Sequence, residues 1–231
     1  MSMFAKFMLN VRQILLPSQC LLCGFTIQIH QRLQWGSVLH QQLCRACFED
    51  LPTPSLQAEY LPLPSTYDAC FTLFPYQAPL SGLILQLKTG ALIHASFFAT
   101  LFLYAIQTHW YVEKPLPDLL LPMPLHPKRI KERGFNQALE IAKPLSKKLG
   151  IPLIKNGIVR HKYTANQRHL KASQRAENMK HAFIHNQSYA NLHVAILDDV
   201  VTTGHTVTAC AQALRMAHAR RIDVWCCTRR Y

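Results

Sequence analysis

The stretch 194–206, VAILDDVVTTGHT, constrains the fold more than any other part of this sequence. Four apolar residues lead directly into the adjacent acids Asp198 and Asp199, and a hydroxyl-rich turn around one glycine follows. A continuous apolar run is typical of a strand that is buried on both faces of a parallel sheet. We therefore predict a strand over 192–197 that ends at the two acids, and a helix over 206–219. Two like charges side by side at a buried strand end destabilise a fold unless cationic or hydroxyl groups meet them.

The other apolar segments continue the alternation of strands and helices. Apolar runs and the turn residues that bound them predict strands at 69–76, 119–124 and 221–228. Helical spacing of the apolar residues predicts helices at 79–88, 95–106 and 136–149. Strands that alternate with helices build parallel sheets. We therefore predict an α/β fold with a mainly parallel sheet and helices on both faces.

The eight cysteines divide into two groups. Four of them form two C-x2-C pairs separated by twenty residues: Cys20, Cys23, Cys44 and Cys47. This spacing is typical of four thiolates around one tetrahedral zinc ion, whose role is structural because no coordination position stays open. Disulfides are the alternative, and a cytosolic location argues against them. The other four cysteines lack such a spacing and are expected as small core residues: Cys70, Cys210, Cys226 and Cys227.

A proline-rich stretch separates the cysteine pairs from the rest of the chain. Residues 51–64 contain four prolines, which is typical of a linker. With 231 residues, of which 49% are hydrophobic, the chain can bury one substantial core and carry a small appendage. We therefore predict a zinc-ribbon-like element at 1–50, a linker at 51–66 and one larger domain at 67–231.

The formal net charge of +13, from 25 basic and 12 acidic residues, lies in the second half of the chain. Residues 1–119 hold 6 basic and 6 acidic residues, whereas residues 120–231 hold 19 and 6. Within that half, residues 126–183 contribute 14 basic and 3 acidic residues. Such a basic region favours phosphates, pyrophosphate or nucleic acid as ligands. A solvated basic surface is the alternative.

No segment has the features of a targeting signal or of a membrane span. The N-terminus, MSMFAKFMLN, lacks the apolar run and the small-residue cleavage site of a secretory signal. The most apolar run, 95–106, is 12 residues long, shorter than the roughly 20 residues that cross a bilayer. We therefore expect a buried helix there and predict a cytoplasmic protein that is not integral to the membrane.

The acidic pair and the turn after it have the chemistry of a ribose-phosphate site. Ligands of open α/β sheets bind where strands end and helices begin. A helix N-terminus offers unpaired N–H groups to a phosphate, and the hydroxyl residues of T-T-G-x-T add donors. Asp198 and Asp199 can accept hydrogen bonds from ribose hydroxyls and share a magnesium ion. A strand capped by an Asx turn is the alternative, and it accounts for one aspartate but not for two.

Three parts of the sequence resemble known proteins. The stretch 194–206 resembles the phosphoribosyl-pyrophosphate (PRPP) signature of type I phosphoribosyltransferases. The stretches 121–137 and 166–183, together with the two C-x2-C pairs, resemble the ComF family of competence proteins. This resemblance implies a phosphoribosyltransferase-like domain that follows a zinc element. It covers nearly the whole chain, from Cys20 to Thr228.

The resemblance implies a role for each group of residues. Asp198 and Asp199 are the implied catalytic residues, which hold the ribose 2- and 3-hydroxyls and a magnesium ion. The implied 5-phosphate site is formed by Thr202, Thr203, Gly204, His205 and Thr206. The implied pyrophosphate site is formed by His126, Lys128 and Arg129. Residues 161–182 match a mobile loop that closes over the site, with a flexible basic segment as the alternative, and its cations are Arg168, Lys171, Arg175 and Lys180.

The sequence leaves the roles of two further motifs open. The run 133–137, RGFNQ, either caps a helix through Asn136 or contacts the ligand. Lys88, which precedes Thr89 and Gly90, is a minor candidate for a phosphate contact.

Two functions agree with these features. The first is a PRPP-dependent phosphoribosyltransferase, a glycosyltransferase that moves a pentosyl group, whose acceptor no segment identifies. The second is a catalytically silent adaptor or docking scaffold that handles single-stranded DNA through the basic region. The resemblance implies action in DNA uptake and natural transformation at the cytoplasmic side, with a helicase-like DNA-uptake protein as a partner.

Overall fold

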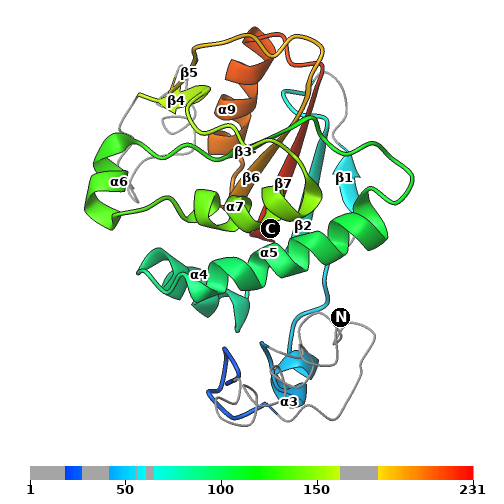
Figure 1. Ribbon diagram of the computed structural model, residues 1–231, viewed down its shortest axis with the longest axis vertical. Coiled ribbons are helices and arrows are strands. Elements are labelled where there is room, and N and C mark those ends of the chain that lie inside the picture. Colours follow the sequence, from blue (N-terminus) through cyan, green and yellow to red (C-terminus); the bar gives the residue numbers. More distant parts are fainter. Residues whose placement is uncertain (1–18, 28–41, 56, 61–64, 162–181, 231) are drawn as a thin grey trace, which may run out of the picture. The chain divides into compact units, whose positions relative to one another are not determined.

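A computed structural model describes residues 19–27, 42–55, 57–60, 65–161 and 182–230 (Figure 1). The chain divides into two compact units, Met1–Pro52 and Thr53–Tyr231. In the described part of the first unit, the short helix α3 (Arg45–Glu49) begins after its N-cap Cys44 and contains Cys47, so it carries the second cysteine pair. The second unit holds the sheets and the other described helices.

A five-stranded sheet forms the centre of the second unit (Figure 1). The strand order is β1-β2-β7-β6-β3, in which four strands are parallel and the edge strand β1 is antiparallel to β2. The strands are β1 (Ala58–Tyr60), β2 (Ala69–Pro75), β7 (Arg221–Arg229), β6 (His193–Val201) and β3 (Leu119–Pro122). Strands β6 and β7 are buried over nearly their whole length, which explains their mostly apolar sequences.

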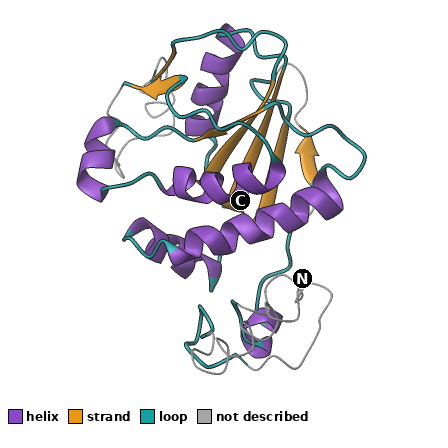
Figure 2. Cartoon of the chain, in the orientation of Figure 1, coloured by secondary structure: helices purple, strands orange, loops and turns teal. Residues whose placement is uncertain are grey.

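Helices cover both faces of this sheet, as the alternation of segments predicts (Figure 2). One face carries α4 (Leu80–Lys88), α5 (Ile93–Ala105) with the π-helical turn η1 (Ile106–Trp110), and α7 (Gln137–Leu149). The other face carries α9 (His205–Met216), which packs against the small antiparallel sheet of β4 (Ile158–Arg160) and β5 (Phe183–His185).

The direction of the connections explains this division of the helices. The crossover from β2 through α5 to β3 runs toward one edge of the sheet. The crossover through α7 continues in the same direction, because Leu153 makes a parallel bridge with Leu120 beyond β3. The crossover from β6 through α9 to β7 runs the opposite way. Since such crossovers are right-handed, α5 and α7 share a face and α9 lies on the other.

Aromatic side chains pack between α5 and the sheet. Phe71 of β2 lies 5.2 Å from Trp110, and Phe102 of α5 lies 6.0 Å from Trp110 and 6.5 Å from Trp225, measured between ring centroids. All four rings are buried. The apolar run 95–106 is therefore a buried helix. Among the described helices, none combines the length and the apolar character needed to cross a bilayer.

A buried polar network fixes the amino ends of β6 and β7. Tyr111 Oη donates to Asp223 Oδ2 at 2.6 Å, His193 Nε2 lies 2.8 Å from the same oxygen, and Arg221 Nε donates to Oδ1 at 3.1 Å. Burial opposes the ionisation of Asp223, but the hydrogen bonds from His193 and Tyr111 outweigh it and hold its pKa below the usual value. The network therefore sets the register in which the carboxyl ends of the two strands lie side by side.

The end of β6 differs from the prediction. The strand does not end at residue 197 but continues through both acids to Val201. Its pairing with β7 continues as well, since Asp198 lies opposite Cys226 and Val201 lies opposite Arg229. The two acids are therefore strand residues, and the turn to the next helix begins after Val201.

Two short elements lie where the sequence indicated irregular chain. The segment after β3, for which the sequence predicts neither helix nor strand, forms the helix α6 (Pro127–Arg133). The ring of His126 caps its first turn, and Gly134 ends it with a φ of 86°, a conformation that favours glycine. Strand β1 lies inside the proline-rich segment 51–66, where it pairs with the edge of β2. Elements this short depend on their caps and neighbours more than on a repeating pattern.

Replacing Gly157 with alanine is expected to destabilise the second unit by about 1–3 kcal/mol. A Cβ atom at this position would lie 1.8 Å from the hydroxyl of the buried Tyr189 and 2.7 Å from Ile154 Cγ2. Gly82→Ala in α4 is the matched control, because its Cβ would meet nothing within 4 Å and alanine favours a helix. Thermal denaturation measures both variants. Equal melting temperatures for Gly157→Ala and the wild type would contradict this packing.

Candidate functional site

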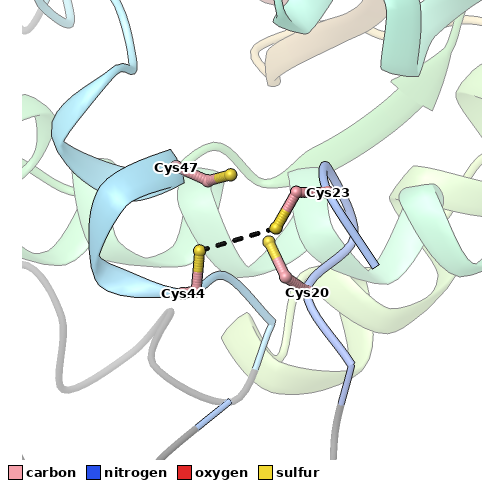
Figure 3. A group of neighbouring side chains, drawn as sticks. All are labelled: Cys20, Cys23, Cys44 and Cys47. Carbon is pink, nitrogen blue, oxygen red and sulfur yellow. Dashed lines mark hydrogen bonds between the residues drawn. The ribbon is translucent and has the colours of Figure 1, made fainter. Parts of the chain in front are cut away.

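The four cysteines of the two C-x2-C pairs, Cys20, Cys23, Cys44 and Cys47, converge (Figure 3). Their Sγ atoms all lie within 4.8 Å of one another, and Cys23 Sγ lies 3.7 Å from Cys44 Sγ. A tetrahedral ion with Zn–S bonds of about 2.3 Å separates its sulfurs by about 3.8 Å. A disulfide needs about 2.05 Å between its sulfurs, and all four cysteines are free thiols. The side chains therefore fit a metal ion such as zinc.

Backbone contacts hold the two cysteine pairs together. The first pair lies on a turn in which the Gly24 N–H donates to Cys20 O at 2.9 Å. Gly24 has a φ of 75°, which explains a glycine directly after the second cysteine of the pair. The Leu21 N–H donates to Gln42 O at 2.9 Å and so joins the two cysteine segments.

Two thiols of the cluster, those of Cys20 and Cys47, differ in how readily they ionise. Burial raises the pKa of the Cys47 thiol well above its usual range, and the neighbouring sulfurs add to this effect. At Cys20, hydrogen bonds from backbone groups outweigh burial and lower the pKa to about 7. A divalent cation stabilises thiolates, so metal binding would stabilise this first unit.

A second candidate site surrounds the acidic pair of β6. Asp198 and Asp199 are 8% and 4% exposed. The ammonium of Lys88, the last residue of α4, lies 2.7 Å from Asp199 Oδ2. On the other side, Gln137 Nε2 donates to Asp199 Oδ1 at 3.2 Å. Lys88 is thus the cation that meets the buried acids.

The two carboxyl groups differ in their ionisation. Burial and the neighbouring charge of Asp199 raise the pKa of Asp198 well above its usual value. Burial also opposes the ionisation of Asp199, but the Lys88 ammonium and hydrogen bonds outweigh it, so the pKa of Asp199 lies below its usual value. Asp198 Oδ1 accepts the N–H of Asp199 at 2.9 Å. The pair therefore combines one carboxylate with one carboxyl group that keeps its proton to higher pH.

The RGFNQ run supplies both a helix cap and a part of this site. Asn136 Oδ1 accepts two N–H groups from the first turn of α7, at 3.0 and 3.4 Å, so the helix-cap interpretation is confirmed. Gln137, the first residue of α7, accepts a hydrogen bond at Oε1 from Arg133 Nη1 at 2.5 Å. Because Gln137 also donates to Asp199, this contact orients its amide and links α6 to the acidic pair.

The turn between β6 and α9 follows the acidic pair closely. It spans residues 202–204, and its two threonines are exposed. Gly204 is the N-cap of α9 with a φ of 77°, and among the described residues a Cβ here would meet the Tyr67 hydroxyl, at 3.9 Å. Thr203 Oγ1 lies 2.9 Å from His205 Nδ1. Of the five residues expected at the 5-phosphate, three therefore form this turn, and His205 and Thr206 begin the helix that follows it.

The residues expected to bind pyrophosphate lie at the start of α6. His126 Nδ1 accepts the Lys128 N–H at 3.1 Å, and His126 Nε2 donates to His161 O at 3.1 Å. These bonds assign the proton to Nε2 and give His126 a capping role. Arg129 Nη1 lies 3.6 Å from Glu132 Oε2, and no residue of α6 is buried. The cations of Lys128 and Arg129 thus lie at the surface of α6.

Arg160, at the end of β4, is a charged residue that no sequence motif marks. Its Cζ atom lies 5.6 Å from the ring centroid of Phe183 in β5. Burial lowers the pKa of its guanidinium, the charge of Asp198 raises it, and the charge of Arg129 lowers it. Arg160 therefore carries positive charge toward both the acidic pair and α6. The pairing of β4 with β5 places it there, and this pairing was not predicted from the sequence.

Comparison with known proteins identifies relatives over most of the chain. No family model matches it. It is 34% identical to the DNA utilization protein YhgH of Salmonella typhi over 224 residues, which cover 92% of this chain and 97% of that protein. It is 31% identical to the protein of the same name from Escherichia coli K12 over 230 residues, with the same coverage. It is 33% identical to Competence protein F of Haemophilus influenzae over 168 residues, which cover 69% of this chain and 72% of that protein.

The chain belongs to the ComF family. In this ComF-family chain, β6 and the turn after it bring together the acidic pair and the five residues expected at a phosphate. Helices α4 and α7 add Lys88 and Gln137, which the sequence did not assign to the acids. The four loop cations lie outside the described residues: Arg168, Lys171, Arg175 and Lys180.

We expect the full-length chain to carry one zinc ion per molecule in the four-cysteine cluster. Cys44→Ser should lose that zinc, because a hydroxyl replaces one of the four thiolates. Elemental analysis of the protein after gel filtration measures the metal content. Cys210→Ser is the control and should keep its zinc, because Cys210 is buried on α9 in the second unit. A zinc-free wild type, or full zinc content in Cys44→Ser, would contradict the assignment.

Proposed function

We propose that this chain binds PRPP together with a magnesium ion at the junction of β6 and α9, and that it acts in DNA uptake. One observation carries the proposal: a buried carboxylate, Asp199, is held ionised just before an open turn that starts a helix. A ligand that suits this arrangement presents hydroxyl groups to the acid and a phosphate to the turn. A ribose 5-phosphate has its 2- and 3-hydroxyls at one end, for the acid, and its phosphate at the other end, for the turn.

In this proposal the turn 202–204 and the first residues of α9, His205 and Thr206, bind the 5-phosphate. The first N–H groups of α9 and the threonine hydroxyls would donate to the phosphate oxygens. The absence of a side chain at Gly204 lets the phosphate approach the backbone, because the nearest described neighbour of that space is the Tyr67 hydroxyl. The helix dipole of α9 favours the negative charge further.

The acidic pair would hold the ribose hydroxyls and a magnesium ion. Magnesium prefers carboxylate and phosphate oxygens, and Asp199 Oδ2 already accepts a cationic group, the Lys88 ammonium, at 2.7 Å. The chemistry of the Asp199 carboxylate therefore fits the ion. When bound, magnesium would withdraw charge from the pyrophosphate of PRPP.

The pyrophosphate would lie toward α6. Lys128 and Arg129 would neutralise it, with His126 holding the first turn of α6 in place. Arg160 adds positive charge between α6 and Asp198. We further propose that the loop cations Arg168, Lys171 and Arg175 close over the bound ligand.

Phosphoribosyl transfer is the reaction that such a site supports. Departure of pyrophosphate from C1 of the ribose breaks a C–O bond and leaves an oxocarbenium-like carbon that a nitrogen acceptor attacks. The described residues offer groups for the sugar and for both phosphate ends. We therefore propose PRPP binding as the primary activity.

The printed names of the relatives support a role in DNA handling. They are a "DNA utilization protein" and a "Competence protein", and a role in DNA uptake in the cytoplasm fits both. One structural observation favours direct binding of single-stranded DNA: four cations lie within the seven residues of α6, none of them buried, namely Lys128, Lys131, Arg129 and Arg133. A helicase-like DNA-uptake protein is the partner that we propose for this role.

Asp199→Asn is expected to weaken the binding of magnesium-PRPP at least about tenfold, because an amide cannot replace a carboxylate toward a cation and two hydroxyls. Isothermal titration calorimetry measures the affinity with the zinc site loaded. Glu113→Gln is the control, since this acid is exposed and lies outside the site. No heat of binding in the wild type would overturn the PRPP proposal.

Binding of single-stranded DNA should weaken as salt increases, and the double charge reversal Lys128→Glu with Lys131→Glu should lower the salt slope by about 1.4. Fluorescence anisotropy with a labelled oligonucleotide measures the affinity over a series of salt concentrations. The reversal of Lys147 and Lys148 on α7 is the matched control, since both residues are exposed and the charge change is equal. A salt-independent affinity, or an equal loss in the control, would exclude α6 as the DNA site.

A further inference from the structure

The position of Lys88 is fixed by the burial of α4. Four apolar side chains of this nine-residue helix are buried: Leu80, Leu83, Ile84 and Leu87. Lys88 follows them as the last helical residue, and its side chain is 29% exposed. The helix therefore presents the ammonium to Asp199 from a packed position, and the Lys88 side chain stays partly exposed.

Protein groups occupy both oxygens of the Asp199 carboxylate. Lys88 Nζ lies 2.7 Å from Oδ2, and Gln137 Nε2 donates to Oδ1 at 3.2 Å. The Asp199 side chain is 5% exposed, so an unpaired charge here would destabilise the fold strongly. Within the described ranges, the charged or titratable groups that act on Asp199 besides Lys88 are Asp198 and the buried thiol of Cys227. Lys88 is the cationic group among these neighbours.

A magnesium ion that binds Asp199 through Oδ2 would require the oxygen that this ammonium occupies. Magnesium binds oxygen at about 2.0–2.1 Å with strict octahedral geometry. An ammonium 2.7 Å from Oδ2 fills the space in which the ion and its remaining ligands would lie. A magnesium ion and an ammonium bound to one buried carboxylate would also repel each other strongly. Lys88 and a divalent cation therefore compete for Asp199.

We propose that Lys88 is a built-in competitor of divalent cations at Asp199. It keeps the carboxylate ionised and paired in the ligand-free protein, and it excludes a free metal ion from the site. A divalent cation then enters when a polyphosphate supplies the other ligands and compensates for the displaced ammonium. The entry of the cation together with a polyphosphate rests on the proposed PRPP site, whereas the competition between Lys88 and the cation does not. Lys88 is in this sense a positioning residue that makes metal binding depend on the ligand.

The binding of Mn²⁺ alone, measured by electron paramagnetic resonance with the cysteine cluster loaded with zinc, tests this competition. Lys88→Met should bind Mn²⁺ at least about tenfold more tightly than the wild type, because the buried carboxylate has lost its counter-ion. Lys88→Arg should behave as the wild type, since it retains the charge. The double variant Lys88→Met with Asp199→Asn should bind Mn²⁺ no more tightly than the wild type, because it lacks the carboxylate. Mn²⁺ should also raise the melting temperature of Lys88→Met but not that of the wild type.

Lys88→Gln provides a second test if Lys88→Met does not fold, because glutamine keeps a hydrogen-bond donor toward Asp199 without the charge. Equal Mn²⁺ affinity in the wild type and the charge-free variants would overturn the proposal. Calorimetry with PRPP separates this result from the proposed function. A gain of Mn²⁺ binding without any PRPP binding would sustain the competition and remove the PRPP site. PRPP binding without a gain of Mn²⁺ binding would sustain the PRPP site and remove the competition.

Discussion

Two adjacent carboxyl groups, Asp198 and Asp199, lie inside the buried strand β6. A buried negative charge needs a cation and hydrogen-bond donors beside it, and this need determines which side chains lie next to the two acids. Asp199 stays ionised because Lys88 approaches one oxygen from α4 and Gln137 approaches the other from α7. Asp198, next to this charge and deeply buried, keeps its proton to a higher pH. Two ionised acids at this depth without a cation would destabilise β6 by several kcal/mol. The fold therefore needs both helices at this end of the sheet.

The crossovers of the α/β fold bring these partners together from distant parts of the chain. The connections through α5 and α7 run in one direction across the sheet, so α4 and α7 lie on the same face of the sheet, from which Lys88 and Gln137 reach the two oxygens of Asp199. At the other end of β6 and β7, the hydrogen bonds of Asp223 hold both strands in register. Because β6 continues directly into the turn before α9, the charged carboxylate and the open helix start keep a fixed relation to each other.

Local signals made much of this structure predictable from the sequence. Apolar runs and glycine stops act over a few residues, so α7 was predicted, as was the convergence of the four cysteines. The Asn136 cap was one of two roles that the sequence left open for the RGFNQ run. Contacts between distant segments were not predictable in this way. Charged residues usually mark a strand end, yet β6 continues past them because β7 pairs alongside. The approach of Lys88 to Asp199 depends on crossover geometry that no motif records.

Carbon-13 NMR of the aspartate carboxyl groups in the ligand-free protein, recorded as a function of pH, tests this charge balance most directly. We expect the Asp199 resonance to keep its ionised position down to a pH below the ordinary aspartate pKa of about 3.9. The Asp198 resonance should titrate above that value. An Asp199 that titrates at or above the ordinary value, or the reverse order of the two acids, would contradict the pairing of Asp199 with Lys88.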